Sequence, residues 1–472
     1  MLIAGAGPVG LTLANELVRL GVRVRIVDKA AARTDKSKAL VLWSRTLELF
    51  DDAGYAAAFL PFGILAHGAE ISTGRELIAQ VPFDAIDSRF PHALMIPQSE
   101  TERVLEERLG SAGVEVERRV ELTGFADKGD EVEATVLGPS GVEERVTAEW
   151  LIGCDGAHST VRHGLGLAFE GETLQSDWVL ADGLISGLDH KDRIQIFWHR
   201  DGILACFPIG ADRWRVVADL GPAEGEGKRA DPTVPEVQAL LTGRGKSGLT
   251  FANPFWLAAF RINERKVKDY RRGCVFLAGD AAHIHSPAGG QGMNTGMQDA
   301  FNLAWKLAMV IEGRARASLL DSYSPERSAV GERVLRNAGR LTEMAVMRNP
   351  IAQGLRNAVV RFATGFPAIQ HRIADQLTEM DIGYPESPLS RGPKAGVRWP
   401  HRLPAGAGGA RFTAVGPAAA VEALAAGYPG LVVAAPEQGS TLLLIRPDGY
   451  VGFAGGPGDQ PQADSYLAAL AP

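Results

Sequence analysis

The sequence has few cysteines, no block of basic residues and no long apolar run, and each absence excludes a class of protein. Its 3 cysteines among 472 residues lie far apart, which excludes a disulfide scaffold and a CxxC-type metal or redox site and favours a reducing compartment. The net charge of −7 argues against a nucleic-acid-binding groove. No segment approaches the roughly 20 apolar residues of a membrane helix, and the apolar N-terminus lacks the basic region of a signal peptide. We therefore expect a soluble, cytoplasmic enzyme.

A glycine-rich turn near the N-terminus has the pattern of a dinucleotide-binding unit. A short apolar strand precedes Gly5, Gly7 and Gly10 of a GxGxxG motif, and an amphipathic helix and a second strand follow, ending at Asp28. Without side chains at the glycines, phosphate oxygens can reach backbone N–H groups at the start of the helix. Asp28 is placed to accept hydrogen bonds from the two hydroxyls of a ribose. The combination predicts dinucleotide binding.

Two further glycine-rich segments follow predicted strands later in the chain. The first contains Asp155 in GCDGAHST, and the second runs from Gly279-Asp280 through Pro287 to Asn294. A carboxylate beside a glycine at the end of a strand can bind a polyol chain. A glycine-lined helix N-terminus can direct backbone donors at an oxygen of a flavin's pyrimidine ring and stabilise the anionic reduced ring.

The three motifs together resemble those of the single-component, FAD-dependent aromatic hydroxylases, the para-hydroxybenzoate hydroxylase-like flavoprotein monooxygenases, over essentially the whole chain. The C-terminal segment is similar to the thioredoxin-like third domain of the phenol and polyketide hydroxylases, through the motif IRPDGYVGF at 445–453. No cysteine follows Cys274, so such a domain would lack CxxC and serve as a structural or interface unit.

The resemblance implies an α/β fold with a Rossmann-like FAD-binding domain, an inserted and mostly antiparallel β-sheet substrate domain, and a C-terminal thioredoxin-like domain. The expected FAD-binding domain is discontinuous, ends in helices and comprises residues 1–70, 92–165 and 265–384. The expected substrate domain comprises 71–91 and 166–264. A linker rich in proline and glycine, 385–404, would then lead to the C-terminal domain at 405–472.

The resemblance also implies site residues. The three N-terminal glycines would cradle the FAD pyrophosphate, Asp28 would hold the AMP ribose, and Asp280 would bind the ribityl hydroxyls near Gln98. Asp155 belongs to a motif that the family links to both FAD and the reducing nucleotide. Pro287 and Gly290 would position the flavin ring for catalysis, with no side-chain base assigned. The full expected cofactor set is Gly5, Gly7, Pro8, Val9, Gly10, Asp28, Lys29, Lys38, Arg45, Gln98, Asp155, Gly279, Asp280, Pro287, Gly290, Gln291, Gly292, Met293 and Asn294.

Lys38 and Arg45 are basic residues at two positions where the family commonly has arginine. Lys38 stands where the family usually has arginine, so it keeps the charge but loses the bidentate fork for phosphate. Arg45 matches a common family arginine, and a solvent-facing residue at the start of a helix is the alternative for it.

Several other polar residues have plainer interpretations. His283 lacks a third metal ligand at suitable spacing, so we expect a structural role for it and no metal site. Glu102 and Asp299 are expected at helix surfaces or caps, and Lys306 is expected as a charge that flanks a packed helix.

The implied function is hydroxylation of an aromatic compound (a phenol, an aryl acid or a polycyclic polyketide) through a flavin hydroperoxide. NADH or NADPH would act as a transient reductant, O2 as co-substrate and FAD as cofactor. The alternatives are Baeyer–Villiger oxidation, epoxidation or flavin oxidase or reductase chemistry on the same fold, and a non-catalytic flavin- or ligand-binding protein. Neither nucleic acid nor membrane is an expected partner, and a homodimer rests on analogy alone.

Overall fold

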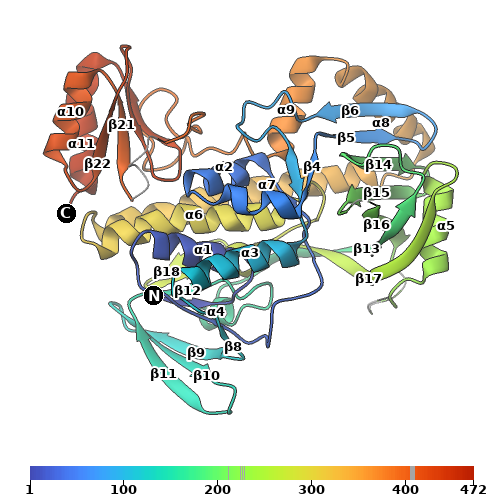
Figure 1. Cartoon of the computed structure of the whole chain (residues 1–472), viewed down its shortest axis with the longest axis horizontal. Helices are drawn as coiled ribbons and strands as arrows, with labels where there is room; N and C mark the ends of the chain where they lie inside the picture. The colour runs from blue at the N-terminus through green and yellow to red at the C-terminus, as the bar shows by residue number, and fades with distance from the viewer. Residues whose placement is uncertain (211, 224, 226, 228, 404–409) are drawn as a thin grey trace.

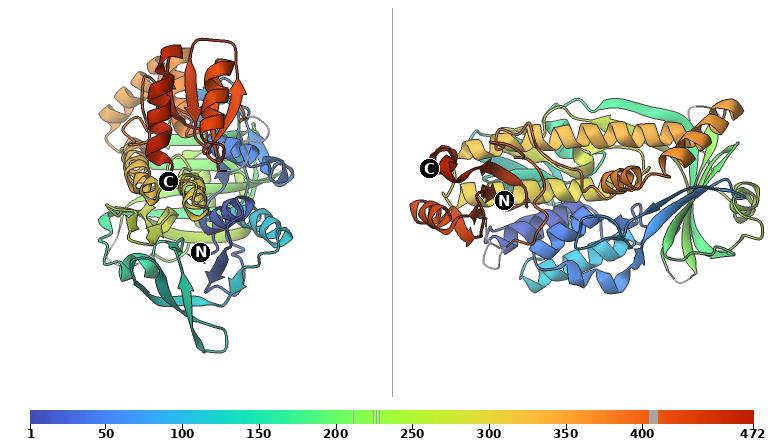
Figure 2. Two further views of the ribbon diagram at one scale, coloured as in Figure 1. Left: turned by 90° about the vertical axis from the view of Figure 1, so that its left-hand side faces the viewer. Right: turned by 90° about the horizontal axis from the view of Figure 1, so that it is seen from above.

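The computed structural model describes residues 1–210, 212–223, 225, 227, 229–403 and 410–472. A central sheet and its helices lie between a large, strongly twisted sheet at one end and a small C-terminal α/β unit at the other (Figures 1 and 2). Within the described part of the chain, no helix is both long and apolar enough to cross a membrane.

The central sheet has the strand order β18-β19-β12-β1-β2-β8 and is parallel except at β18. Its strands β1, β12 and β19 are fully buried, as expected for a parallel sheet covered on both faces. Because parallel strands end at the same edge, the segments after them, with Gly5, Asp28, Asp155 and Asp280, meet there. The bounds are β1 (Leu2–Ala4), β2 (Arg25–Asp28), β8 (Glu117–Arg118), β12 (Leu151–Gly153), β18 (Arg271–Arg272) and β19 (Val275–Leu277).

Helices α1, α3 and α6 cover this sheet, with α1 packed against both of the others, and α7 packs on α6 (Figure 1). An antiparallel meander of β9, β10 and β11 and a small sheet of β3, β7 and β4 complete this part. The bounds are α1 (Pro8–Arg19), α2 (Ser44–Asp52), α3 (Gln98–Ser111), α4 (Thr160–Gly164), α6 (Gly292–Ile311), α7 (Tyr323–Ala345), β3 (Val41–Leu42), β4 (Ile64–Ala66), β7 (Ala93–Met95), β9 (Glu121–Asp127), β10 (Val132–Leu137) and β11 (Glu143–Ala148); short 3₁₀ turns are η1 (Ala56–Ala58), η2 (Leu60–Phe62), η3 (Gly279–Ala281) and η4 (Ala317–Ser322).

The large sheet has the order β20-β17-β13-β16-β15-β14-β5-β6 and is antiparallel except where β14 pairs with β5. This confirms the predicted mostly antiparallel sheet. Its helix α5 begins with a capping box between Thr233 and Glu236. The bounds are β5 (Gly68–Ser72), β6 (Leu77–Pro82), β13 (Glu170–Ser186), β14 (Arg193–His199), β15 (Gly202–Pro208), β16 (Arg213–Pro222), α5 (Val234–Arg244), β17 (Thr250–Lys266) and β20 (His283–Ile284).

Helices α8 (Pro350–Ala363) and α9 (Pro367–Leu377) pack against β6 of the large sheet. Val360 contacts a cluster that contains Ile78 and Trp198, and Ala374 lies in a cluster with Val81. The sequence placed these helices at the end of the FAD-binding domain. In the structure both helices pack on β6 at the end of the large sheet, with Arg356 over the Trp198 ring and Ala374 beside Val81.

The C-terminal unit has the strand order β22-β21-β23-β24, with β21 and β22 parallel and the other pairs antiparallel. The thioredoxin-like assignment stays a prediction, and residues 404–409, where the expected linker meets this unit, lie outside the described residues. The bounds are β21 (Phe412–Gly416), α10 (Ala418–Gly427), β22 (Val432–Pro436), β23 (Leu442–Ile445), β24 (Val451–Gly455), η5 (Pro457–Asp459) and α11 (Gln460–Leu470).

Candidate functional site

The first glycine-rich turn joins β1 to α1 and is shaped by backbone contacts. Gly5 has φ +100°, and a Cβ there would lie 2.3 Å from the Cys154 carbonyl oxygen. A Cβ on Gly10 would lie 2.0 Å from the Gly5 carbonyl oxygen. A Cβ on Gly7, by contrast, would have no described atom within 4 Å. Pro8 then begins α1, so the turn is closed on its protein side and open at Gly7, where a phosphate could approach the helix start.

Asp28 ends β2 and braces this turn. Its carboxylate oxygens accept hydrogen bonds from the N–H groups of Ala6 and Ala30, both at 2.7 Å. Each oxygen keeps a further lone pair, so the carboxylate can still accept from ribose hydroxyls. The side chain of the neighbouring Lys29 is 63% exposed and lies 4.0 Å from Glu121, and its cofactor role stays a prediction.

Gln98 begins α3 and is fixed on both sides of its amide. Its Oε1 accepts from the Ala39 N–H at 3.1 Å, and its Nε2 donates to Glu102 at 2.8 Å. The expected surface position of Glu102 is therefore wrong: this residue is 4% exposed, and its carboxylate orients Gln98.

Asp155 supplies an unsatisfied acceptor directly beside the first turn. Its Oδ2 accepts from the Val161 N–H at 3.2 Å, whereas its Oδ1 is buried without a partner among the described residues. A Cβ on Gly5 would lie 2.9 Å from the Asp155 Cα, which shows how closely the two segments approach. Since a buried carboxylate oxygen without a donor is costly, it indicates a hydroxyl or N–H group of a bound ligand.

Asp280 lies in the tight turn η3, where Gly279 has φ +60° and a Cβ would lie 2.7 Å from Val9 Cγ2. Asp280 is solvent-exposed. The surrounding protein nevertheless desolvates the carboxylate and raises its pKa, against the lowering effect of His283 and Lys38. The charge of Lys38 therefore acts on Asp280, so the Lys38 loop lies at the same edge of the central sheet as Asp280.

A buried ionic frame holds the Asp280 turn from behind. Asp299, on α6, accepts from the Gly279 N–H at 2.9 Å, pairs with His283 at 2.8 Å and binds Arg327 at 2.5 Å. Burial alone would raise the pKa of Asp299, but Arg327 and His283 hold it below its usual value. The Nε2 contact of His283 with Asp299 agrees with the expected structural role, while its Nδ1 is buried without a partner among the described residues. Asp299, expected at a helix surface or cap, is instead 0% exposed and connects η3 to α7.

The loop before α6 presents mainly backbone. Gly290 has φ +64°, and a Cβ there would lie 2.8 Å from Val41 Cγ1. Pro287 is exposed, while Gly292 begins α6 and Met293 packs partly against the main core. The helix dipole makes this N-terminus favourable for negative charge.

The polar side chains of this loop point into the protein. Gln291 Nε2 donates to the Gln376 carbonyl at 2.7 Å. Asn294 accepts from the Trp43 N–H at 2.9 Å and donates to the Val41 carbonyl at 2.9 Å. Both side chains therefore fix the loop from the protein side.

His285 adds a second unsatisfied acceptor near the start of α6. Its Nδ1 donates to the Ser286 carbonyl at 2.8 Å, so Nε2 carries no proton; this atom is buried and unpaired within the described part of the chain. A Cβ on Gly292 would lie 3.4 Å from it. Burial, with a smaller contribution from His283, lowers the pKa of His285 to about 4, so the ring is neutral. No pattern in the sequence pointed to this role of His285.

Arg45 is buried rather than solvent-facing, and its guanidinium has partners within the protein. It is 1% exposed, donates to Glu48 at 3.1 Å and to the Asp448 carbonyl at 2.8 Å, and lies 4.7 Å from the centroid of the Tyr450 ring. The solvent-facing alternative is therefore wrong, and a cofactor role for Arg45 stays a prediction. The guanidinium instead joins α2 to the β23–β24 turn.

Lys306 belongs to a second buried network at the same junction. It is 0% exposed and binds Glu326 at 2.7 Å, and Glu326 also binds Arg446 of the C-terminal unit at 2.6 Å. Burial lowers the pKa of Lys306 to about 8, against the raising effect of Glu326. Lys306 was expected to be a charge that flanks a packed helix, but it is buried between α6, α7 and the end of β23.

Arg215 connects the large sheet to the cofactor edge. It binds Asp182, its partner on the adjacent strand, through two hydrogen bonds of 2.6 and 2.7 Å. Its remaining nitrogen donates to the Lys38 carbonyl at 3.2 Å. The pair is buried, so it fixes the Lys38 loop against β16. Sequence reasoning missed it because the two residues carry no shared motif.

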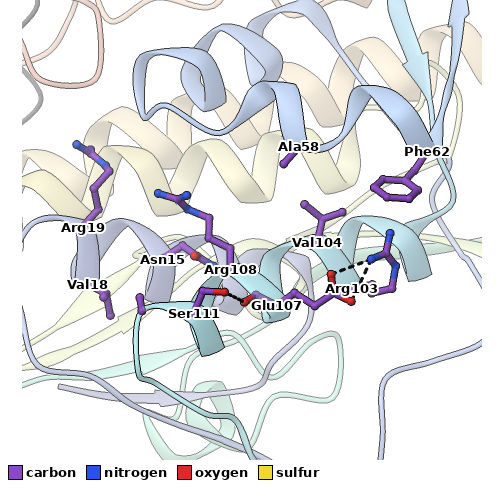
Figure 3. Close-up of a pocket in the computed structure, with 11 residues that line it drawn as sticks. Asn15, Val18, Arg19, Ala58, Phe62, Arg103, Val104, Glu107, Arg108 and Ser111 are labelled. Carbon is purple, nitrogen blue, oxygen red and sulfur yellow. Dashed lines mark hydrogen bonds and ion pairs between the residues drawn. The ribbon is translucent and has the colours of Figure 1, made fainter.

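A cavity of about 610 Å³ lies elsewhere, between α1, the η1–η2 segment and α3 (Figure 3). Figure 3 shows the Arg19 and Arg108 side chains extending toward the segment that carries Ala58. Its lining comes from the C-terminal half of α1, from Ala58 and Phe62, and from residues 103–112 of the α3 segment, and it contains no residue of the expected cofactor set. The described residues also contain no group of three potential metal ligands.

Glu379 is a buried carboxyl group whose charge is disfavoured. It lies behind α6 and accepts from Thr295 Oγ1 and Gln298 Nε2, each at 2.6 Å. Burial raises the pKa of Glu379 to about 8, although Arg327 lowers it. The Glu379 carboxyl is therefore largely protonated at neutral pH.

This protonation gives a testable pH dependence. Because the folded pKa lies above the ordinary value of 4.5, the stabilisation is fully present below pH 4.5 and is lost as pH rises through about 8. We expect Glu379→Gln to remove this loss, so that its melting temperature exceeds that of the wild type at pH 9 and matches it more closely at pH 5. Thermal unfolding across this range measures the difference. Equal slopes for both proteins would contradict the assignment.

The comparisons with known proteins decide the family. A family model described as FAD binding domain matches residues 1–338. The chain belongs to this FAD-binding family. This match and the relatives described below confirm the predicted cofactor, FAD. They also confirm the predicted class, a flavin-dependent monooxygenase of the aromatic hydroxylase group.

Two curated relatives illustrate the similarity. The 6-methylpretetramide 4-monooxygenase of Streptomyces rimosus is 40% identical over 412 residues, which cover 85% of this chain and 72% of the relative. The pentachlorophenol 4-monooxygenase of Sphingobium chlorophenolicum is 32% identical over 411 residues, which cover 85% of this chain and 75% of the relative.

Solved structures extend the match to the whole chain. The OxyS anhydrotetracycline hydroxylase from Streptomyces rimosus is 31% identical, with a TM-score of 0.83 and coverage of 100% of this chain and 98% of that one. CabE, an aromatic hydroxylase from angucycline biosynthesis, is 32% identical, with a TM-score of 0.80 and coverage of 100% and 99%. The predicted α/β fold class is confirmed by these matches.

The residues present fit FAD. Gly7 leaves an opening at a helix start, Asp155 Oδ1 and His285 Nε2 are buried acceptors in need of donors, and the carboxylate of Asp280 is exposed. These groups suit, in order, a pyrophosphate and the hydroxyl and N–H groups of a flavin nucleotide.

Proposed function

We propose that the protein hydroxylates a phenolic polycyclic polyketide with NADPH or NADH as transient reductant and O2 as co-substrate. One observation carries the proposal: Gly7, Asp155 and Asp280 come together at one edge of the central sheet with the start of α6, which presents mainly backbone. This edge is connected to the large sheet through Arg215. The names of the relatives, which include a pretetramide and an anhydrotetracycline hydroxylase, support the substrate class.

In this proposal the chain's own residues bind and orient. The turn at Gly7 would hold the FAD pyrophosphate, Asp28 the AMP ribose, and Asp280 the ribityl hydroxyls. When bound, FAD supplies the redox chemistry and oxygen activation that side chains lack. The N-terminus of α6 would stabilise negative charge at the pyrimidine edge.

The second contribution of the chain is rigidity. Arg215 fixes the Lys38 loop to the large sheet, and Asp299 fixes the Asp280 turn to α6 and α7. Together these contacts fix the position of the cofactor edge relative to the large sheet. A fixed position is required if a substrate ring is to be oriented for reaction. A side-chain base for activation of a phenol is not part of the proposal. The cytoplasmic location expected from the sequence stays a prediction.

The proposal is tested by reductant oxidation and oxygen uptake across a panel of simple phenols, aryl acids and polycyclic phenols. We expect one polycyclic phenol to accelerate NADPH or NADH oxidation by about tenfold or more and to give a product heavier by one oxygen atom. Ring-reduced analogues of the same size serve as controls and should give no acceleration. Oxidation that no aromatic compound changes, with hydrogen peroxide as sole product, would establish an oxidase instead, and an ester or lactone product would establish Baeyer–Villiger chemistry.

A further inference from the structure

The cavity between α1, the η1–η2 segment and α3 combines basic and apolar side chains (Figure 3). Its volume of about 610 Å³ lies within the range of roughly 300–1,000 Å³ that is typical of small-molecule sites. Such sites have largely apolar walls and a few polar groups that orient the ligand. Here the apolar part of the lining includes Val18, Ala58, Phe62 and Val104, and three arginines supply most of the charge.

Two of the three arginines are balanced by acidic partners. Arg19 pairs with Glu16 at 2.6 Å. Arg103 pairs with Glu100 at 2.9 Å and with Glu107 at 2.8 Å. The positive charges of these two arginines are therefore largely neutralised within the protein, and they add little to the binding of an anion.

Arg108, the third arginine, has no acidic partner among the described residues. It is half-buried, and its guanidinium lies over the Tyr55 ring at 4.4 Å without a side-chain hydrogen bond or ion pair to any described residue. The ring beneath it is fixed, because Tyr55 is 3% exposed and its hydroxyl donates to Glu16 at 3.0 Å. One face of the Arg108 guanidinium is thus supported, while its N–H donors are available to a ligand.

An aromatic surface lies in the same cavity as this charge. Figure 3 shows Arg108 between Phe62 and Arg103 at one end of the cavity and Arg19 at the other. Phe62 is 45% exposed, and the Arg103 guanidinium lies 4.2 Å from the centroid of its ring. Much of the Phe62 ring is therefore open to a second ring.

One unpaired guanidinium beside apolar walls favours a singly charged organic anion. The planar fork of arginine matches a carboxylate through two parallel N–H···O bonds. A phosphate carries more negative charge, and the carboxylate of Glu107, which also lines the cavity, disfavours it. The apolar lining favours an aromatic body over a small hydrophilic acid.

We propose that this cavity binds an aromatic carboxylate, with the carboxylate on Arg108 and the ring against Phe62, Ala58 and Val104. The site is separate from the cofactor edge, since none of its lining residues belongs to the expected cofactor set. The inference therefore goes beyond the proposed function and does not depend on the outcome of the hydroxylation assay.

The test is calorimetric titration of the FAD-loaded protein with 2-naphthoate, and with 2-naphthylmethanol as the uncharged analogue. We expect 2-naphthoate to bind at one site with a Kd below about 1 mM, and the alcohol to bind at least about tenfold more weakly. In Arg108→Gln the Kd for 2-naphthoate should rise by about tenfold or more, because both the charge and the fork are lost. Arg108→Lys keeps the charge without the fork, so its Kd should lie between the two.

A second variant and a matched control complete the design. Phe62→Ala removes the exposed ring and should raise the Kd for 2-naphthoate by about threefold or more. Arg200→Gln changes an arginine whose side chain is 79% exposed on the β14–β15 turn of the large sheet, and it should leave this Kd unchanged. Thermal unfolding checks that all the variants are folded.

Three results would overturn the proposal. Failure of 2-naphthoate to bind the wild type at millimolar concentration would exclude an aryl-carboxylate site. An unchanged Kd in Arg108→Gln would place the bound 2-naphthoate elsewhere, for example at the large sheet. Equal affinity for 2-naphthylmethanol would show that the cavity does not recognise the carboxylate.

Discussion

Replacement of Asp299 by alanine is expected to lower the free energy of unfolding by about 3–5 kcal/mol and to abolish retention of FAD. Asp299 is 0% exposed and is the carboxylate nearest to Arg327, at 2.5 Å. Its removal leaves the buried Arg327 charge without this partner and the Gly279 N–H without its acceptor. Denaturant unfolding and the flavin absorbance of the purified protein measure the two effects.

The controls separate charge from shape. Asp299→Asn keeps an acceptor for the Gly279 N–H but loses the charge. Its free energy of unfolding and its flavin content should therefore lie between those of the wild type and of Asp299→Ala. Because the folded pKa of Asp299 is lowered, its contribution is present above the ordinary carboxyl pKa and is lost as pH falls through the folded value. The wild type and the variants should therefore converge in acid. Equal stability and flavin content for Asp299→Ala at neutral pH would refute the role of this frame.

Two glycine substitutions should separate cofactor contact from backbone packing. In Gly10→Ala the new Cβ would lie 2.0 Å from the Gly5 carbonyl oxygen, so the turn itself must distort and both stability and FAD binding should fall. In Gly7→Ala the new Cβ would meet no described atom within 4 Å. The stability of the FAD-free protein should then change by less than about 0.5 kcal/mol. The methyl group would nevertheless stand where the pyrophosphate is expected, and we expect the Kd for FAD to rise by about tenfold or more.

The matched control is Gly110→Ala on α3, where a Cβ would likewise have no described atom within 4 Å. It should leave the Kd for FAD unchanged. Fluorescence titration of the flavin-free proteins gives the Kd values, and thermal unfolding gives the stabilities. A Gly7→Ala protein that binds FAD as tightly as the wild type would remove the first turn from the cofactor site.

The sequence was sufficient for those parts of the site that depend on local backbone geometry. Gly5 and Gly279 were predictable because each stands where the chain turns directly after a strand, and Gly10 because the first turn of the following helix approaches the Gly5 backbone closely. Asp155 and Asp280 were also predicted to follow strands. In the structure these strands belong to one parallel sheet, so the two residues lie at the same edge.

The side-chain networks could not be predicted in the same way. Arg45 contacts Asp448, which is 403 positions away, and Arg215 contacts Lys38, which is 177 positions away. Such contacts follow from how helices and sheets pack, and no local pattern encodes them. For the same reason Asp299 and Lys306, whose helical spacing was compatible with exposed positions, were placed wrongly.

The packing of α8 and α9 illustrates a further limit. Their sequence pattern indicates amphipathic helices but does not say which neighbour receives the buried face. The strand β6 is far from them in sequence, and it is the tertiary fold that brings the two together.

The central claim is that FAD lies along the carboxyl edge of the central sheet, and a crystal structure of the FAD-loaded protein tests it most directly. We predict density for the pyrophosphate at Gly7, with the ribityl chain near Asp280 and the pyrimidine edge of the flavin at the start of α6. Asp155 Oδ1 and His285 Nε2 should then have hydrogen-bond donors. Flavin density in the 610 Å³ cavity between α1 and α3, with the glycine edge empty, would contradict the account.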